Sequence, residues 1–146
     1  MKMKWYTVAA AIGAVAILAS CNAAASIPTT LQVTQGNVTN IIYNNGSYTY
    51  PSQAVGVNTF SASFTIKNTS STTAYSVTAI TSSNNTQFAV SGTTSGSLNP
   101  GGTLTFLIEN TGSTLSAGTY STTVSITNNA PDTTPYFKFA FNVTLK

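Results

Sequence analysis

Apolar and polar residues alternate with a period of two along much of this chain, and this alternation restricts its fold more than any other feature. In residues 60–67 every second residue, beginning with Phe60, is apolar. Successive side chains of a β-strand point to opposite faces, so this segment is expected to be a strand with one face in a core. The same pattern recurs in residues 104–108, 120–126 and 137–145. We expect these strands to share one core that contains Phe64, Phe106 and Phe139.

Weaker strand patterns and turn sequences fill the rest of the chain after its N-terminus. The turns include Asn44-Asn45-Gly46 and Asn99-Pro100-Gly101-Gly102, whose residue types favour tight turns. The weaker strands are predicted at residues 30–33, 41–50, 74–80 and 87–90. With no helical period, the chain is expected to be all-β, an antiparallel immunoglobulin-like β-sandwich of seven to eight strands. Residues 30–50 form either its first strand or a separate hairpin, and the sequence leaves both open.

Two local patterns predict how strands begin and end. Tyr120 follows Gly118 at the start of a late strand, which resembles the tyrosine corner of immunoglobulin-like sandwiches, where the hydroxyl bonds to nearby backbone. Tyr120 is therefore expected to be structural. Asn68, Asn110 and Asn128 each stand where a strand is expected to end, and a side-chain amide at such a position can cap a turn.

Charged residues make up 5% of the chain, against roughly 25% in an average soluble protein. The formal net charge is +3, but Lys2 and Lys4 lie in a segment that we expect to be removed. Three lysines then remain against Glu109 and Asp132, a net charge of +1, and there is no Arg. This excludes nucleic acid as a partner, because its phosphates are bound by clustered cations. With so little charge, self-association would meet little repulsion between copies.

The N-terminus has the layout of an export signal. Two lysines precede an apolar run at residues 5–18, which is shorter than a membrane-spanning helix requires. The sequence Leu18-Ala19-Ser20-Cys21 resembles the lipobox of bacterial lipoproteins. This resemblance implies a signal peptide at residues 1–20, lipidation of Cys21 with acyl chains such as palmitate, a tether at residues 21–29 and the sandwich at residues 30–146. Two or more acyl chains hold a protein durably to a bilayer.

A second interpretation of this region is an ordinary signal peptide. Ala23-Ala24-Ala25 also fits a signal-peptidase site, which would release a chain that begins at Ser26 and is freely secreted, as it would be if Cys21 were removed. Cys21 is the single cysteine, so the domain has no disulfide in either case. We expect a lipid-anchored protein of the cell envelope. Asn22, by resemblance to enterobacterial lipoproteins, would permit transfer to the outer membrane or cell surface.

The expected domain offers few groups for chemistry. It has one Glu, one Asp and no His, so neither a nucleophile with a base nor a metal site can be assembled. We therefore expect no catalytic residues, no metal and no cofactor. Asp132 is expected to be a turn residue. A glycosidase would need the carboxyl groups of Glu109 and Asp132 within about 10 Å of each other in a cleft.

Several short motifs follow one another along the chain: residues 64–68, Phe88-Ala89-Val90, residues 98–102, Gly118-Thr119-Tyr120 and residues 126–131. Their order resembles the choice-of-anchor D family, which is similar to the immunoglobulin-like domains of the abnormal-spindle and hydin type. The resemblance covers about residues 55–146 and implies a non-catalytic extracellular module. Two features depart from the family, Glu109-Asn110-Thr111-Gly112 in place of a Pro-containing stretch and Asn129 in place of Asp.

Two functions compete at this point. The first is a binding or adhesion module that meets an unknown protein or glycan partner through loops or a sheet edge. The second is a self-assembling structural subunit of a surface layer or fibre. Tyr43, Tyr48 and Tyr50 either stack on a partner or, as we expect, pack within strands. Chance explains the glycosylation sequons at Asn37, Asn45, Asn68, Asn84 and Asn142 in a chain so rich in Asn and Thr.

Overall fold

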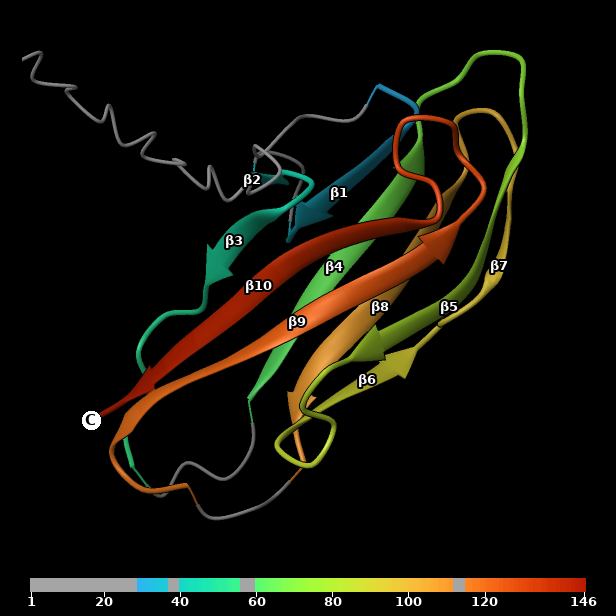
Figure 1. The fold of residues 1–146 in the computed structure, drawn as a ribbon. Helices are drawn as coiled ribbons and strands as arrows, with labels where there is room; N and C mark the ends of the chain where they lie inside the picture. The colour runs from blue at the N-terminus through green and yellow to red at the C-terminus, as the bar shows by residue number, and fades with distance from the viewer. Residues whose placement is uncertain (1–28, 37–39, 56–59, 112–114) are drawn as a thin grey trace, which may run out of the picture.

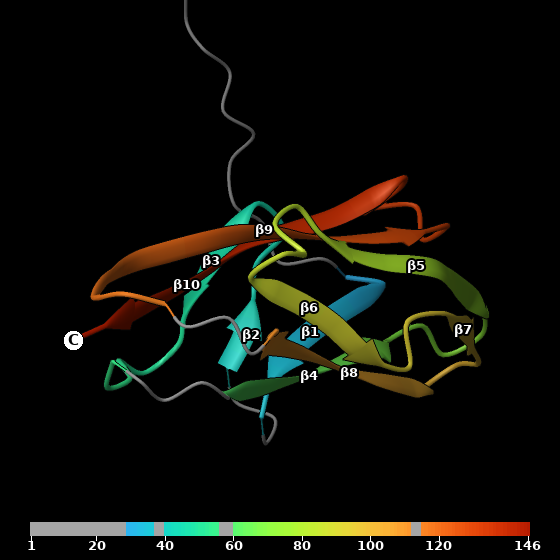
Figure 2. The same ribbon diagram turned by 90° about the horizontal axis from the view of Figure 1, so that it is seen from below.

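The computed structural model describes residues 29–36, 40–55, 60–111 and 115–146 as two β-sheets packed face to face (Figure 1 and Figure 2). One sheet has the strand order β2-β1-β4-β8-β6 and the other β3-β10-β9-β5-β7. The strands are β1 (Leu31–Gln35), β2 (Asn40–Ile42), β3 (Gly46–Thr49), β4 (Ser61–Asn68), β5 (Tyr75–Ser82), β6 (Phe88–Gly92), β7 (Gly96–Leu98), β8 (Thr103–Asn110), β9 (Gly118–Asn128) and β10 (Tyr136–Leu145). Within these residues no helix is long and apolar enough to cross a membrane.

The topology is that of an immunoglobulin-like sandwich, as the sequence predicts. The order β1-β4-β8-β6 matches the ABED sheet of this fold, and β5-β9-β10 matches its CFG sheet. The described residues form ten strands, because residues 41–50 divide into β2 and β3 and because β7 has only three residues and no alternation that the sequence reveals. All strand pairs are antiparallel except β3 with β10, which is parallel.

Residues 30–50 belong to the sandwich and contribute to both of its sheets. β1 pairs with β4, β2 pairs with β1, and β3 crosses to the opposite sheet, where Gly46 pairs with Phe139. The crossing is a tight turn in which Asn45 has a φ of 60°. A Cβ on Gly46 would lie 2.9 Å from the Cβ of Tyr43, so the turn accepts only glycine there without a shift of the backbone.

Aromatic rings fill the space between the sheets. Phe64, Phe106 and Phe139, the residues expected in the core, are 0%, 0% and 1% exposed. The ring of Phe64 lies 5.4 Å from that of Phe106 in its own sheet and 5.2 Å from that of Phe139 in the other, measured between centroids. Such contacts stabilise beyond the burial of area alone. The alternation in β4, β8 and β10 therefore supplies one common core.

Two of the three tyrosines between residues 43 and 50 pack against this core. Tyr48 meets Phe64 edge to face at 5.4 Å, and burial raises the pKa of its hydroxyl, with a further rise from the neighbouring Tyr50. Tyr50 packs at 5.2 Å from Phe60 and donates to the carbonyl oxygen of Ser61 at 3.3 Å. Tyr43 stays 45% exposed on the surface.

Tyr120 makes the backbone contact that defines a tyrosine corner. Its hydroxyl donates to the carbonyl oxygen of Ser116, four residues upstream, at 3.0 Å. The ring packs against the edge of the core. This bond fixes the chain as it enters β9.

The asparagines at the strand ends are buried, and two of them hold turns together. Asn68 is 0% exposed. Its amide nitrogen donates to the carbonyl oxygens of Thr73 at 2.8 Å and Leu98 at 2.9 Å, and its amide oxygen accepts from the backbone of Ser70 at 2.9 Å. One side chain therefore joins the β4–β5 connection to β7, which is more than the local cap that the sequence predicts.

Asn128 organises the turn between β9 and β10 in the same way. Its amide oxygen accepts from the backbone of Ala130 at 3.0 Å and from the hydroxyl of Thr133 at 2.8 Å. Its amide nitrogen donates to the carbonyl oxygen of Ile126 at 3.1 Å. Asn110, at the end of β8, is also buried, but its amide oxygen has no hydrogen-bond partner in the described part of the chain.

Replacing Asn68 by alanine is expected to lower the free energy of unfolding by roughly 2–3 kcal/mol, because the buried carbonyl group of Leu98, the more exposed one of Thr73 and the N–H group of Ser70 lose their partner. Urea denaturation measures this change. The matched control is Asn85→Ala in the exposed β5–β6 turn, for which we expect a change within about 0.5 kcal/mol. Equal effects of the two substitutions would contradict the structural role of Asn68.

Candidate functional site

The candidate functional site lies at the start of the described sandwich, directly before β1. Cys21, the expected lipidation site, lies outside these residues, as do the expected signal peptide and all of the expected tether except Thr29. The described residues begin at Thr29, two residues before Leu31, the first residue of β1. Figure 1 shows the start of β1 beside the turn between β9 and β10, at the end of the sandwich opposite to the C-terminus.

The carboxylate of Asp132 holds the first two described residues. Its Oδ2 accepts from the backbone N–H of Thr29 at 2.5 Å, the hydroxyl of Thr29 at 3.1 Å and the backbone N–H of Thr30 at 3.0 Å. Its Oδ1 accepts from the hydroxyl of Thr30. Four donors from two consecutive residues thus converge on one side chain that lies 102 and 103 positions further along the chain. We call this arrangement the Asp132 clamp.

The other side of Thr29 and Thr30 is fixed by the end of β4. Thr69 donates its backbone N–H to the carbonyl oxygen of Thr30 at 3.0 Å and its hydroxyl to that of Thr29 at 2.6 Å. The turn that carries Asp132 is itself held by the buried amide of Asn128. Thr29 and Thr30 are therefore bound both by the β9–β10 turn and by the residue that follows β4.

The hydrogen bonds of the clamp favour the ionised carboxylate. Partial burial alone would raise the pKa of Asp132, but the hydrogen bonds from Thr30 and Thr29 outweigh it and hold the pKa below the usual value. The sequence analysis expected a turn residue at this position, and Asp132 does lie in a turn. Its partners were not foreseen because nothing local to residues 131–133 indicates Thr29 or Thr30.

Glu109 lies far from Asp132. It is on the outer face of β8, where it accepts from the hydroxyls of Ser91 at 2.5 Å and Ser61 at 3.5 Å. Ser61 begins β4, whereas the clamp lies beyond its other end. Seven residue steps along a strand span roughly 23 Å, more than the 5–10 Å or so that separates paired carboxyl groups in glycosidases. In the described ranges no group of three His, Cys, Asp or Glu side chains lies close enough to hold a metal ion.

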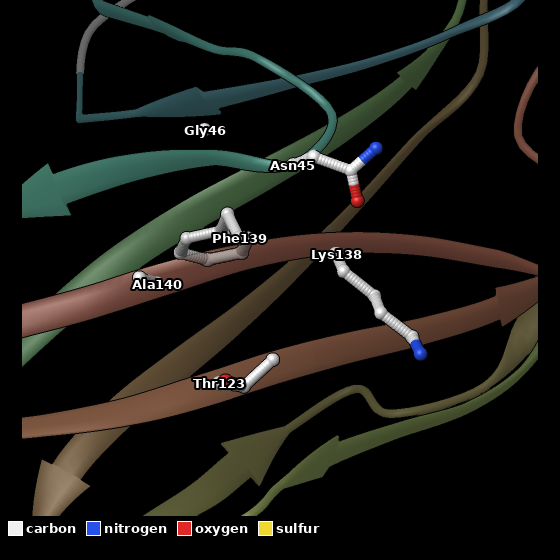
Figure 3. Close-up of a pocket in the computed structure, with 6 residues that line it drawn as sticks. All are labelled: Asn45, Gly46, Thr123, Lys138, Phe139 and Ala140. Atoms are coloured by element: carbon white, nitrogen blue, oxygen red, sulfur yellow. The ribbon is translucent and has the colours of Figure 1, made fainter. Parts of the chain in front are cut away.

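A shallow hollow of ≈ 240 Å³ lies on the outer face of β10, next to the β2–β3 turn. The turn is docked there by two bonds: the backbone of Asn45 donates to the carbonyl oxygen of Lys138 at 2.7 Å, and Lys138 donates its backbone N–H to the amide oxygen of Asn44 at 3.0 Å. Figure 3 shows the side chain of Lys138 leaning toward β9 and away from Asn45. The hollow is lined by Asn45, Gly46, Thr123, Lys138, Phe139 and Ala140.

Tyr136 is a surface residue beside this hollow that the sequence analysis did not single out. It is 46% exposed, and the ammonium group of Lys138 lies 4.8 Å from the centroid of its ring. The alternation of β10 contains the signal that identifies it: Phe137, Phe139 and Phe141 point inward, so Tyr136 must point outward. An exposed aromatic ring paired with a cation is a contact surface typical of interfaces.

The exchange of Asp132 for Asn tests the clamp. Asn has nearly the same size but lacks the charge and presents an NH2 group to donors. We expect faster amide hydrogen exchange at Thr29 and Thr30 and a loss of less than about 1 kcal/mol of unfolding free energy, because exposed ionic contacts are weakened by solvent. Unchanged exchange at both threonines would rule out a role of the clamp in fixing the N-terminal segment.

Lowering the pH is expected to release the clamp as well. A lowered pKa in the folded state adds stability that is fully present above the ordinary carboxyl pKa of about 3.9 and is lost as the pH falls through the lower folded value. Between about pH 4 and pH 2 the wild-type protein should therefore lose more stability than Asp132→Asn. Thermal unfolding of both proteins across this range measures the difference. Parallel pH profiles would contradict the lowered pKa.

Comparison with known proteins gives similarity at the level of the fold. No protein-family model and no curated protein matches this sequence. The structure is similar to the ASH / PapD-like domain of human CEP192 (PapD-like domain 7), with a TM-score of 0.51 and 14% identity over 100% of this chain and 96% of that one. Membership of the choice-of-anchor D family stays a prediction from the sequence.

Two further solved structures share parts of this architecture. A family 123 glycoside hydrolase from Clostridium perfringens matches with a TM-score of 0.53 and 10% identity over 80% of this chain, which corresponds to 28% of that enzyme chain. The CooA pilin subunit from enterotoxigenic Escherichia coli matches 80% of this chain and 99% of that one at 14% identity, with a TM-score of 0.37 that supports no argument. At sequence identities this low, structural similarity shows a shared fold and does not show a shared function. This chain has the fold of the PapD-like, immunoglobulin-like β-sandwich domains.

Proposed function

We propose that this protein is a non-catalytic, lipid-anchored module of the cell envelope that presents an immunoglobulin-like sandwich for binding or adhesion. The Asp132 clamp is the observation that carries the proposal. A tethered domain gains from a fixed attachment point, because the attachment then sets which surfaces face away from the membrane. Thr29 and Thr30 are bound on two sides, by Asp132 and by Thr69, where the predicted tether ends.

The length of the predicted tether limits how far the domain stands from the bilayer. Seven residues separate Cys21 from Thr29, and a fully extended chain of this length reaches roughly 28 Å. The clamped end of the sandwich therefore stays close to the membrane. β10 runs from this end to Leu145 at the opposite end. There the backbone of the next residue, Lys146, pairs with Gln53 and Val55. That opposite end lies roughly 30 Å further out along the strand, where partners across the surface can reach it.

The placement of the carboxyl groups supports a module without chemistry of its own. Asp132 is occupied by the clamp and Glu109 by two serine hydroxyls at the other end of β4. The two carboxyl groups therefore lie too far apart to act together as an acid–base pair. A surface that presents mainly hydroxyl and amide groups instead suits recognition through many weak polar contacts.

Substitution of Cys21 by Ser is expected to move the protein from the membrane fraction to the soluble fraction, because the acyl chains have no attachment site. Intact mass of the wild-type protein should show an acylated N-terminus at Cys21. The matched control is Ser26→Ala, which leaves the lipobox intact and should leave the protein in the membrane. A wild-type protein that begins at Ser26 without lipid would overturn the anchor and indicate a freely secreted domain.

A structural role in a layer or fibre is the second candidate, and the edge strand β6 favours it. β6 pairs with β8 on one side alone, and its five residues contain neither a charge nor a proline. Edge strands without such protection can pair with another chain. The other edge strands, β2, β3 and β7, have three or four residues each, so β6 is the longest of the described edges.

Sedimentation velocity at rising protein concentration separates the two functions. The binding module should remain a monomer, whereas a layer subunit should assemble. If assembly occurs through β6, Ala89→Lys should suppress it, because a lysine on an edge strand opposes pairing. Thr123→Lys adds the same charge to the exposed face of the central strand β9 and should leave assembly unchanged. A monomer at all concentrations rejects the structural role.

A further inference from the structure

A hollow of ≈ 390 Å³ lies on the outer face of β1, β4 and β8, on the sheet opposite to the hollow of Figure 3. Its volume falls within the range of roughly 300–1,000 Å³ that is usual for small-molecule sites. Neither the strand predictions nor the proposed function assigns a role to it. Its lining consists of Gln32, Thr34, Gly36, Thr65, Lys67, Gly101 and Thr103.

The strand register places the polar side chains of this hollow in two adjacent rows. One row crosses the sheet through Thr34 and Thr65. It continues on β8 with Thr105, which does not line the hollow and whose hydroxyl lies 3.4 Å from that of Thr65. The other row crosses through Gln32, Lys67 and Thr103. Neighbouring strands lie about 4.8 Å apart, and residues two positions apart on one strand lie about 7 Å apart, so the side chains of both rows can contact one small ligand at the same time.

Two glycine turns form the rims of the hollow and keep it open. Gly36 has a φ of 62° and donates to the carbonyl oxygen of Ser63, and Gly101 has a φ of 75° and donates to that of Asn68, each at 3.1 Å. A Cβ built on either glycine meets no atom within 4 Å. The rims are therefore fixed to β4 by backbone bonds, and they place no side chain over the space between them.

The chemistry of the lining selects a polar ligand with a negative charge. It offers three hydroxyls, one carboxamide and one ammonium group, and it contains no aromatic ring and no carboxylate. The carboxylate of Glu109 lies on the same outer face but six residues along β8 from Thr103, roughly 20 Å away. Lys67 thus contributes a positive charge that no residue of the lining balances.

We propose that this hollow binds an acidic sugar unit of a surface polysaccharide. Hydroxyl and amide groups in two rows can pair with sugar hydroxyls, while Lys67 pairs with the carboxylate or the phosphate that makes the sugar acidic. A nucleic acid does not fit this lining, because binding it requires several cations and stacking aromatic rings. The inference rests on the proposed function to the extent that display from the cell envelope brings the hollow to such polymers.

Titration of the detergent-solubilised full-length protein with trigalacturonate tests the proposal, with amide chemical shifts as the readout. We expect the shifts to change at Thr34, Thr65 and Thr103. Lys67→Gln should weaken the affinity by about tenfold, because a hydrogen bond to a charged group is lost. Lys138→Gln is the matched control, since it removes the same charge from the outer face of the other sheet, and it should leave the affinity unchanged.

Three further measurements separate a sugar site from simple attraction of an anion. Maltotriose, which is neutral, should bind more weakly than trigalacturonate. Thr65→Val, which removes one hydroxyl, should lower the affinity for trigalacturonate but not the affinity for inorganic phosphate. Equal affinities for trigalacturonate and phosphate, equal effects of Lys67→Gln and Lys138→Gln, or no shifts in the hollow at millimolar trigalacturonate would each overturn the proposal. Membrane fractionation of Lys67→Gln separates a failure of the sugar site from a failure of the proposed function. This variant should remain in the membrane fraction whether or not it binds the sugar.

Discussion

The antiparallel pairing of β9 with β10 supports both the core and the Asp132 clamp of this domain. It joins every residue of β10 to β9, from Tyr136 to Leu145, and so fixes which side chains of β10 enter the core. A slip of one residue would turn Phe139 and its inward neighbours toward solvent. The same slip would displace the turn that carries Asp132, so Thr29 and Thr30 would lose the hydrogen bonds to its carboxylate. Burial of the aromatic rings between the sheets therefore also maintains the clamp.

The scarcity of charge shapes how this domain meets its surroundings. Ser, Thr and Asn cover the outer faces of both sheets, and each face carries a lysine within a strand, Lys67 on one and Lys138 on the other. An isolated charge among hydroxyl groups is weakly screened by neighbouring charges of the protein, so its position has more influence on recognition than it would on an ordinary surface. The two lysines nevertheless differ, since Lys138 lies against the ring of Tyr136 and Lys67 lines an open hollow.

Local patterns predicted several elements well, and the reason is the short range of their chemistry. The alternation in residues 60–67 predicted β4 because the direction of a side chain in a strand depends only on its parity. The sequence Gly118-Thr119-Tyr120 predicted the start of β9 because the tyrosine corner closes over four residues. The division of residues 41–50 into β2 and β3 was not predicted, because the turn at Asn45 and Gly46 sends β3 to a strand some 90 residues away.

The amino-acid sequence predicts the all-β class, the core positions of Phe64, Phe106 and Phe139 and the turn position of Asp132, since each of these follows from composition or from neighbours within a few residues. The partners of Asp132, the crossing of β3 to β10 and the grouping of Gln32, Thr65, Lys67 and Thr103 around one hollow arise only in the folded chain. These residues are neighbours because strands distant in sequence pair in one register. Register depends on the packing of the whole core, which no short segment of the sequence contains.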